Sequence, residues 1–171
     1  NLKNYAPRRG MVYQKEINGQ PSKLFFPSYN SLVAINATNG TYIKNFGKNG
    51  IVKLKKPSIT APTIFENNLI ITTSEPSLEV YDLDNGNLIW KFILMKKQSK
   101  RYGGKRYDHS GGNPWGGFSL DKLRGIAYIT TGNAGRYFNG VNRPGNNEYS
   151  NSIIFFDIKN KKKLWSFQEV R

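Results

Sequence analysis

The sequence predicts an all-β protein built from repeated four-stranded antiparallel units. Three observations lead to this fold class. One pattern, an apolar strand followed by an acidic or amide residue, a turn and an aromatic residue, occurs three times. Further short apolar runs bounded by turn residues precede each copy. No stretch shows the 3.6-residue period of an amphipathic helix, so strands and turns account for the chain.

Each copy of the pattern predicts a hairpin: a strand, a turn that tolerates a positive φ, and a second strand whose aromatic residue packs inward. The second and third copies share one register, because eight residues separate Asp82 from Trp90 and Asp157 from Trp165. Lys161 replaces the turn glycine in the third copy, which implies a small strain cost. The copies run from Leu32 to Gly40, closing at Phe46, from Leu78 to Gly86, closing at Trp90, and from Ile153 to Lys161, closing at Trp165.

The spacing of the copies is typical of propeller blades. Asn36 and Asp82 are 46 residues apart, which is close to the length of one four-stranded blade. Asp82 and Asp157 are 75 residues apart, so this blade carries an insertion, the polar and glycine-rich loop from Met95 to Pro114. Long polar loops commonly form a binding face. The remaining strands are expected at Lys23 to Pro27, Thr63 to Thr73 and Gly125 to Thr130.

Length and composition favour one domain or a piece of one. The chain has 171 residues, of which 37% are hydrophobic, and it contains no cysteine, so neither a disulfide framework nor a thiolate metal site is available. No run approaches the roughly 18 apolar residues of a membrane span, and the start lacks the apolar core of a signal peptide. Because it starts without a methionine, at Asn1, and stops at Arg171 directly after a repeat ends, we expect both ends to be cut.

The formal charge of +15 raises the alternative of a nucleic-acid-binding protein. The lysines are spread along the chain, with local concentrations only at Lys96 to Arg106 and at Lys159 to Lys163. Solvated faces explain most of this charge, so we expect no nucleic-acid partner. A basic nucleic-acid binder would instead show a steep salt dependence on DNA.

The stretch from Gly111 to Asn133 is the strongest candidate for a binding site. Trp115 stands among four glycines, so its indole offers a flat face with little bulk around it for a planar ligand. An apolar strand follows and ends at Asn133, whose side-chain oxygen is a hard ligand suited to Ca²⁺. The alternative is that Trp115 is a core tryptophan of a β-protein and that Asn133 is a turn residue.

Five motifs occur along the chain: Pro7 to Tyr13, Leu24 to Ser28, Phe46 to Gly50, Trp115 to Asp121 and Trp165 to Gln168. Together, and in this order, they make the chain resemble the quinoprotein dehydrogenases, which depend on pyrroloquinoline quinone (PQQ). Within that family it is most similar to the glucose, polyol and quinate dehydrogenases. The resemblance implies an eight-bladed β-propeller, of which residues 1–171 would be a partial domain of about three blades, truncated at both ends.

The resemblance assigns site residues position by position. It makes Trp115 the tryptophan beneath the quinone ring and Asn133 a Ca²⁺ ligand, and their separation of 18 residues fits the family. Arg9 matches an arginine that pairs with a cofactor carboxylate, a role that suits a guanidinium. Ser74 matches a serine that hydrogen-bonds another carboxylate of the cofactor.

Other positions depart from the family pattern. Ile59 stands at the position where the family usually has a threonine that contacts the cofactor, and the nearest hydroxyl is that of Thr60. Glu75 is either a Ca²⁺ ligand or an exposed loop acid. His109, beside Asp108, is either a solvated loop residue or an acid/base. The family's catalytic aspartate would lie beyond Arg171, so no catalytic residue is expected in this chain.

The resemblance implies part of a PQQ- and Ca²⁺-dependent dehydrogenase that oxidises a sugar, polyol or other alcohol by hydride transfer to the quinone. Its electron acceptor would be a quinone or a cytochrome, and its location the periplasm. Any membrane association would come from parts outside this chain. The alternative is a non-catalytic propeller with PQQ-like repeats that serves as a scaffold or interaction protein.

Overall fold

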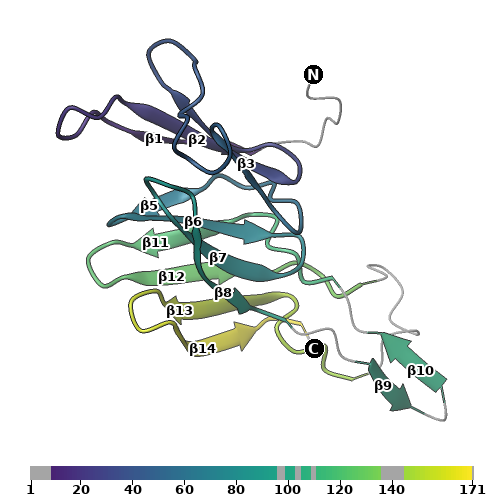
Figure 1. Cartoon of the computed structure of the whole chain (residues 1–171). Helices are drawn as coiled ribbons and strands as arrows, with labels where there is room; N and C mark the ends of the chain where they lie inside the picture. Colours follow the sequence, from purple (N-terminus) through teal and green to yellow (C-terminus); the bar gives the residue numbers. More distant parts are fainter. Residues whose placement is uncertain (1–8, 96–98, 103–104, 109–110, 136–144, 171) are drawn as a thin grey trace. The chain divides into compact units, whose positions relative to one another are not determined.

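The computed structural model describes residues 9–95, 99–102, 105–108, 111–135 and 145–170 (Figure 1). These residues form three four-stranded antiparallel sheets and one two-stranded hairpin. The first sheet contains β1 (Val12–Gln14), β2 (Lys23–Pro27), β3 (Ser31–Asn36) and β4 (Ile51–Lys53), and the second β5 (Thr63–Phe65), β6 (Asn68–Thr73), β7 (Ser77–Asp82) and β8 (Leu88–Ile93). The third contains β11 (Phe118–Asp121), β12 (Ile126–Thr130), β13 (Ser152–Asp157) and β14 (Lys162–Gln168), and the hairpin consists of β9 (Ser99–Tyr102) and β10 (Lys105–Asp108).

The order of strands in each four-stranded sheet follows the order in the chain, so each sheet is a simple meander. This arrangement confirms the all-β class and the unit of four antiparallel strands. The chain divides into two compact units, Asn1–Lys91 and Phe92–Arg171, with the boundary inside β8. Over the residues that the structure describes, no helix has the length and apolar character of a membrane span.

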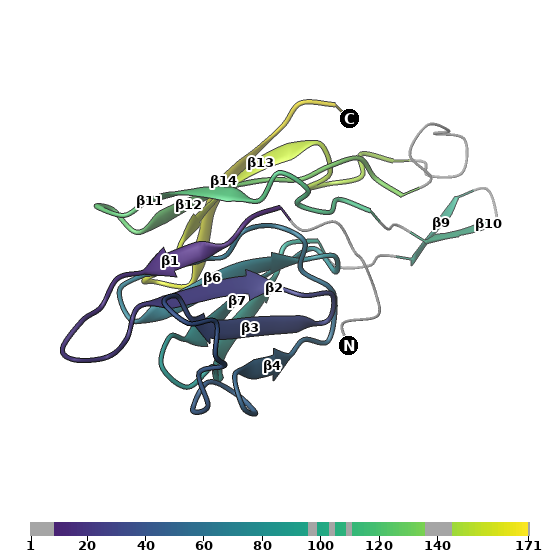
Figure 2. The same ribbon diagram turned by 90° about the horizontal axis from the view of Figure 1, so that it is seen from above.

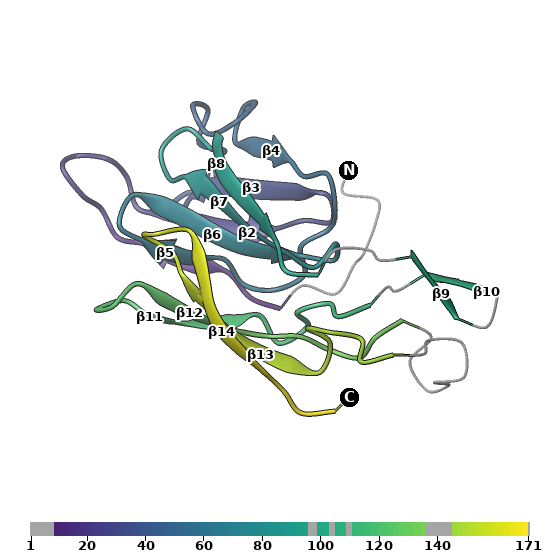
Figure 3. The same ribbon diagram turned by 90° about the horizontal axis from the view of Figure 1, so that it is seen from below.

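In the first unit, β2 and β3 lie against β6 and β7 and enclose a shared core (Figures 2 and 3). Phe25 and Phe46 meet edge to face in this core, with ring centroids 5.4 Å apart. A backbone hydrogen bond of 2.7 Å from the Gly47 amide to the Asn85 carbonyl joins the two sheets. Gly86 leaves room for this junction, because a Cβ there would lie 2.6 Å from a methyl group of Val52. The remaining buried members of the core are Leu32, Ala34, Ile43, Leu54, Leu69, Ile71, Tyr81 and Leu83.

The turns of the repeat have the predicted geometry. In the second copy a side-chain oxygen of Asp82 accepts the amides of Asp84 and Asn85 at 3.0 and 2.9 Å. The turn glycines have φ of +73° at Gly40 and +74° at Gly86. Lys161 takes the equivalent conformation with φ of +54°, which is the strained position that the sequence predicts.

Beyond the three copies of the repeat, the short turn expected before the strand at Ile126 has the same geometry. It joins β11 to β12, where a side-chain oxygen of Asp121 accepts the amides of Leu123 and Arg124, each at 3.0 Å. Gly125 follows with φ of +72°. The sequence lacks the Asn-Gly pair here, but an aspartate four residues before a glycine is a signal of this geometry.

Inward packing of the closing aromatic residue is confirmed for one copy and wrong for another. Phe46 is fully buried, but it lies in a loop, and the fourth strand of its sheet comes later at Ile51–Lys53. Trp165 lies on β14 as predicted, yet 51% of it is exposed. It stacks on Phe155 at 3.5 Å, and Phe155 meets Tyr128 at 4.7 Å, so these rings form a row across three strands in direct register.

The insertion expected as a loop between Met95 and Pro114 contains the β9–β10 hairpin. Its register pairs Arg101 with Arg106 and Lys100 with Tyr107. His109 lies outside the described residues, so neither reading of that histidine is tested.

Candidate functional site

The loop that carries Trp115 is fastened to the end of β12. The Gly112 amide donates to the Asn133 carbonyl at 2.8 Å, and the Asn113 carbonyl accepts the amides of Trp115 and Gly132 at 2.9 and 3.0 Å. These bonds place the side chain of Trp115 beside Gly132, where a Cβ would lie 2.9 Å from the indole Cδ1. Two residues that are 18 positions apart in the sequence, Trp115 and Asn133, are therefore held together in the second unit.

The indole of Trp115 is not a core residue of this unit. It is 42% exposed, whereas the buried faces of β12 and β13 are filled by Ala127, Ile129, Ile154 and Phe156. The glycine at position 132 gives the ring room to approach the backbone, and Gly116 approaches the Thr130 hydroxyl, with a Cβ position 3.2 Å from it. A half-exposed aromatic face with glycines around it suits a planar ligand.

Asn133 is exposed, and its backbone is fixed through its carbonyl by the Gly112 amide. Its side chain therefore projects from a fixed backbone at an exposed position. The amide oxygen of such a side chain is a suitable ligand for a hard cation.

Three other predicted residues converge on one segment in the first unit. The Arg9 amide donates to the Ile59 carbonyl at 2.8 Å, and Arg9 also forms a parallel bridge with Thr60. The Ser74 amide donates to the Pro57 carbonyl at 2.8 Å. The segment from Pro57 to Thr60 thus holds Arg9 on one side and the end of β6 on the other.

The position of Thr60 favours a structural role over a surface contact. Thr60 is 3% exposed, and its hydroxyl is 3.0 Å from that of Thr72, which is also buried. Arg9, in contrast, is exposed, and Ser74 is partly buried. Of these three residues, Arg9 and Ser74 are the better placed to meet a ligand.

Glu75 has a different partner from the one its predicted role requires. A carboxylate oxygen of Glu75 lies 2.9 Å from the Lys91 ammonium, which lies at the same distance from a carboxylate oxygen of Glu79. An ion pair with lysine competes with metal ligation, so Glu75 would have to change partners to bind Ca²⁺. Among the described residues there is no group of three or more His, Cys, Asp or Glu that could hold a metal ion.

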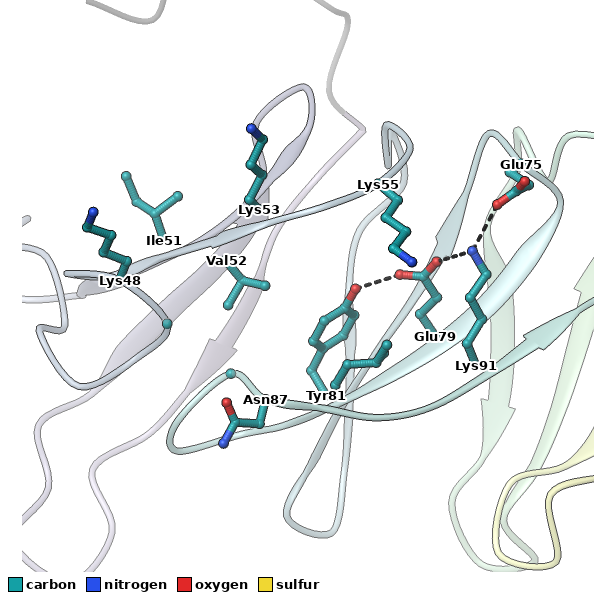
Figure 4. A pocket seen from close by; sticks show the side chains of 13 residues that line it. Lys48, Ile51, Val52, Lys53, Lys55, Glu75, Glu79, Tyr81, Asn87 and Lys91 are labelled. Carbon is teal, nitrogen blue, oxygen red and sulfur yellow. Dashed lines mark hydrogen bonds and ion pairs between the residues drawn. The ribbon is translucent and has the colours of Figure 1, made fainter.

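A buried polar network that the sequence did not predict surrounds Glu79 on β7 (Figure 4). Its two carboxylate oxygens accept the hydroxyls of Tyr81 at 2.5 Å and Ser77 at 3.1 Å. The Ser77 hydroxyl lies 2.7 Å from that of Thr73. Burial raises the pKa of Tyr81, and the hydrogen bond and charge of Glu79 raise it further. Burial lowers the pKa of Lys91, but the hydrogen bonds to Glu75 and Glu79 outweigh burial and leave this pKa raised.

These shifts predict a loss of stability at alkaline pH. Tyr81 and Lys91 hold their protons more tightly in the folded chain than in the unfolded chain, so their contribution is complete below pH of about 10 and declines as pH rises further. Denaturant unfolding of the complete protein at several pH values between about 8 and about 11 measures the decline. Tyr81→Phe should reduce the alkaline decline, while Tyr13→Phe on the exposed residue should leave it unchanged. An equal decline in all three proteins would contradict the role of Tyr81.

Comparison with known proteins identifies the family of the chain. Residues 2–171 match the model of the PQQ family described as the β-propeller domain of glucose, ethanol and alcohol dehydrogenases. The glycerol dehydrogenase large subunit of Gluconobacter oxydans (strain 621H) is 26% identical over 162 residues, which are 81% of this chain and 22% of that protein. The quinoprotein glucose dehydrogenase A of Acinetobacter calcoaceticus is 27% identical over 172 residues, 86% of this chain and 22% of that protein.

A solved structure shows the same fold. A europium-containing methanol dehydrogenase superposes with a TM-score of 0.70 at 19% identity, over 96% of this chain and 32% of that one. The chain spans about a fifth of the length of the curated relatives it matches. With three four-stranded antiparallel sheets and a family match over nearly its whole length, the chain belongs to the PQQ-dependent dehydrogenase β-propeller family.

Proposed function

We propose that the protein containing this chain is a PQQ- and Ca²⁺-dependent dehydrogenase that oxidises a sugar, a polyol or another alcohol. The observation that carries the proposal is the half-exposed indole of Trp115, packed beside Gly132 and next to Asn133. The glycerol and glucose dehydrogenases among its relatives support an alcohol or sugar substrate.

The residues present fit PQQ, a planar quinone with three carboxylates. Trp115 would contact the flat face of the cofactor, and the glycine at position 132 keeps that ring against the backbone. The guanidinium of Arg9 would bind one cofactor carboxylate, and the Ser74 hydroxyl another. Thr60 would contribute only if its hydroxyl left Thr72. When bound, PQQ supplies the quinone that accepts hydride from the alcohol.

Asn133 is proposed as a ligand of the metal ion, with Glu75 as a second ligand once it releases Lys91. A metal ion next to the cofactor would polarise its reactive carbonyl. Because one structural relative contains europium, assays with both Ca²⁺ and a lanthanide ion are needed to identify the metal. We further propose a periplasmic location and a quinone or cytochrome as the electron acceptor. The catalytic aspartate would lie outside this chain.

Trp115→Phe tests the contact with the cofactor. In the complete protein, PQQ should bind less tightly by roughly fivefold, because the smaller ring covers less of the cofactor and stacking is worth on the order of 1 kcal/mol. The melting temperature without cofactor should barely change, since the side chain is 42% exposed. Titration of PQQ by fluorescence and melting of the apo-protein are measured on the same variant.

The control for this variant is Trp165→Phe, which changes a tryptophan of similar exposure that is not assigned to the cofactor. It should leave PQQ affinity unchanged. Unchanged PQQ affinity in Trp115→Phe, together with a large loss of apo stability, would reject the cofactor contact. Failure of the unaltered complete protein to bind PQQ would instead favour the non-catalytic propeller scaffold.

Asn133→Ala tests the metal ligand. One oxygen ligand is lost, so the concentration of Ca²⁺ needed for half-maximal activity should rise about tenfold or more, and excess Ca²⁺ should partly restore activity. Titration of Ca²⁺ into metal-stripped protein measures the shift. Full activity of the variant at limiting Ca²⁺ would show that Asn133 is only a turn residue.

A further inference from the structure

A cavity of about 860 Å³ lies within the first unit, where β4 of the first sheet faces β7 and β8 of the second (Figure 4). Drug-sized and cofactor-sized ligands occupy cavities of this order. None of the residues assigned to PQQ lines it, and only Glu75 is shared with the proposed metal site.

The lining carries an excess of positive charge. Four lysines and two glutamates line the cavity. Lys91 is bound by both glutamates, so Lys48, Lys53 and Lys55 supply the excess. Of these three, Lys55 directs its ammonium toward Glu79, whereas Lys48 and Lys53 direct theirs away from the Tyr81 side of the cavity (Figure 4). Within the described residues, no carboxylate lies within ion-pair distance of Lys55.

The carboxylate inside the cavity is not available for a cation. Glu79 is 3% exposed, and both of its oxygens are already engaged, one by Tyr81 and the other by Ser77 and Lys91. A cationic ligand would have to break these bonds and would meet the ammonium of Lys55, which is directed toward Glu79 (Figure 4). An anionic ligand meets that ammonium without breaking any of them.

Apart from Asn87, the rest of the lining consists of glycines and of aliphatic and aromatic side chains. Val52 and Tyr81 face each other across the cavity (Figure 4). Leu88 on β8 also lines the cavity and is 52% exposed. A large aliphatic side chain left half exposed in a concave surface gains from an apolar ligand that covers it.

We propose that this cavity binds an amphiphilic anion, a carboxylate or phosphate joined to an aliphatic body, with the anionic group at Lys55 and the aliphatic body over Val52 and Leu88. The same chemistry is offered by a free fatty acid and by the headgroup and chain of an anionic lipid. Lys55, Val52 and Leu88 are not among the residues assigned to PQQ or to the metal ion, so this proposal does not rest on the proposed function.

Laurate below its micelle concentration is the probe, and its affinity for the complete protein is measured by titration calorimetry. Lys55→Ala should weaken binding about tenfold, because one charge-assisted contact is lost. The neighbouring Lys56→Ala removes the same charge from a residue that does not line the cavity and should change affinity less than about twofold. Dodecyltrimethylammonium, with the same chain and the opposite charge, should bind at least about tenfold more weakly than laurate.

The apolar half is tested with Leu88→Ser, which should weaken laurate about fivefold, against Leu123→Ser on an exposed leucine outside the cavity. Vesicles of phosphatidylglycerol distinguish the two sources of the ligand. Retention on vesicles that requires Lys55 identifies a lipid, and laurate binding without such retention identifies a soluble anion. No laurate binding and no Lys55-dependent retention, or equal losses in Lys55→Ala and Lys56→Ala, would overturn the proposal.

Discussion

Replacement of Glu79 by alanine is expected to lower the free energy of unfolding of the first unit by about 3 kcal/mol, since it removes one partner of a buried charge pair. The carboxylate is 3% exposed and joins the Tyr81 hydroxyl, the Ser77 hydroxyl and the Lys91 ammonium. Its loss leaves the Tyr81 hydroxyl buried without that acceptor, and Lys91 keeps only Glu75. Denaturant unfolding of the complete protein measures the change.

Two further variants separate charge from hydrogen bonding. Glu79→Gln keeps an acceptor of the same size for Tyr81 but loses the charge opposite Lys91, so about half of the destabilisation should remain. Glu16→Ala removes an exposed carboxylate and should change the free energy of unfolding by less than about 0.5 kcal/mol. Hydrogen exchange of the amides of β6 and β7 shows whether the loss is local. If Glu79→Ala and Glu16→Ala unfold at the same denaturant concentration, the network contributes no stability.

Much of the fold could be predicted because the turns carry their own chemistry. A strand that ends in Asp or Asn, followed by a residue able to take a positive φ, sets the hairpin at Asp82 and Gly86 without reference to the rest of the chain. Whether the closing aromatic residue is buried or exposed could not be predicted in the same way. Phe46 is covered because the second sheet packs on it, whereas Trp165 is 51% exposed among the described residues. Burial depends on tertiary neighbours, which the local pattern does not specify.

The candidate site was predictable in part for a related reason. Glycines around an aromatic residue are a local signal, so the open surroundings of Trp115 could be anticipated, and the structure gives the contact with Gly132. Pairing of Trp115 with Asn133 came from the family resemblance and not from spacing alone. The partner of Glu75 was missed, because Lys91 stands 16 residues later on another strand and only the packing of the strands brings the two charges together.

The network around Glu79 was missed for the same reason. In the sequence this glutamate alternates with Leu78 and Val80, so it reads as the solvent-facing position of a half-buried strand. Instead all of β7 from Ser77 to Tyr81 is buried, and the polar residues face one another. The alternation of side chains along β7 could be predicted from its sequence, but the burial of both faces of the strand could not.

Gly111→Ala is expected to disrupt the second unit more than Gly116→Ala or Gly132→Ala, because a Cβ at Gly111 would meet backbone atoms at shorter distances. Gly111 has φ of +88°, and a Cβ would overlap the Gly135 amide nitrogen and the Asn133 carbonyl oxygen. These atoms belong to the strand end that Gly111 and Gly112 clasp through the bridge to Ala134 and the bond to Asn133. Since all of the obstructing atoms are backbone, no rotamer change relieves the overlap, and the loss of stability should be about 3 kcal/mol or more.

Gly40→Ala is the matched control, because Gly40 has φ of +73° but a Cβ there would have no neighbour within 4 Å. It should cost only about 1 kcal/mol, the price of the backbone conformation alone. In the complete protein, Gly111→Ala should also weaken PQQ binding, because the loop that carries Trp115 moves away from Asn133, while Gly40→Ala should leave PQQ affinity unchanged. Unfolding and PQQ titration on both variants separate the effect of the backbone overlap at Gly111 from the effect of a positive φ alone. Equal costs for the two substitutions would show that the loop is not clamped against β12, and a destabilised Gly111→Ala protein that still binds PQQ normally would show that the clamp does not position Trp115 for the cofactor.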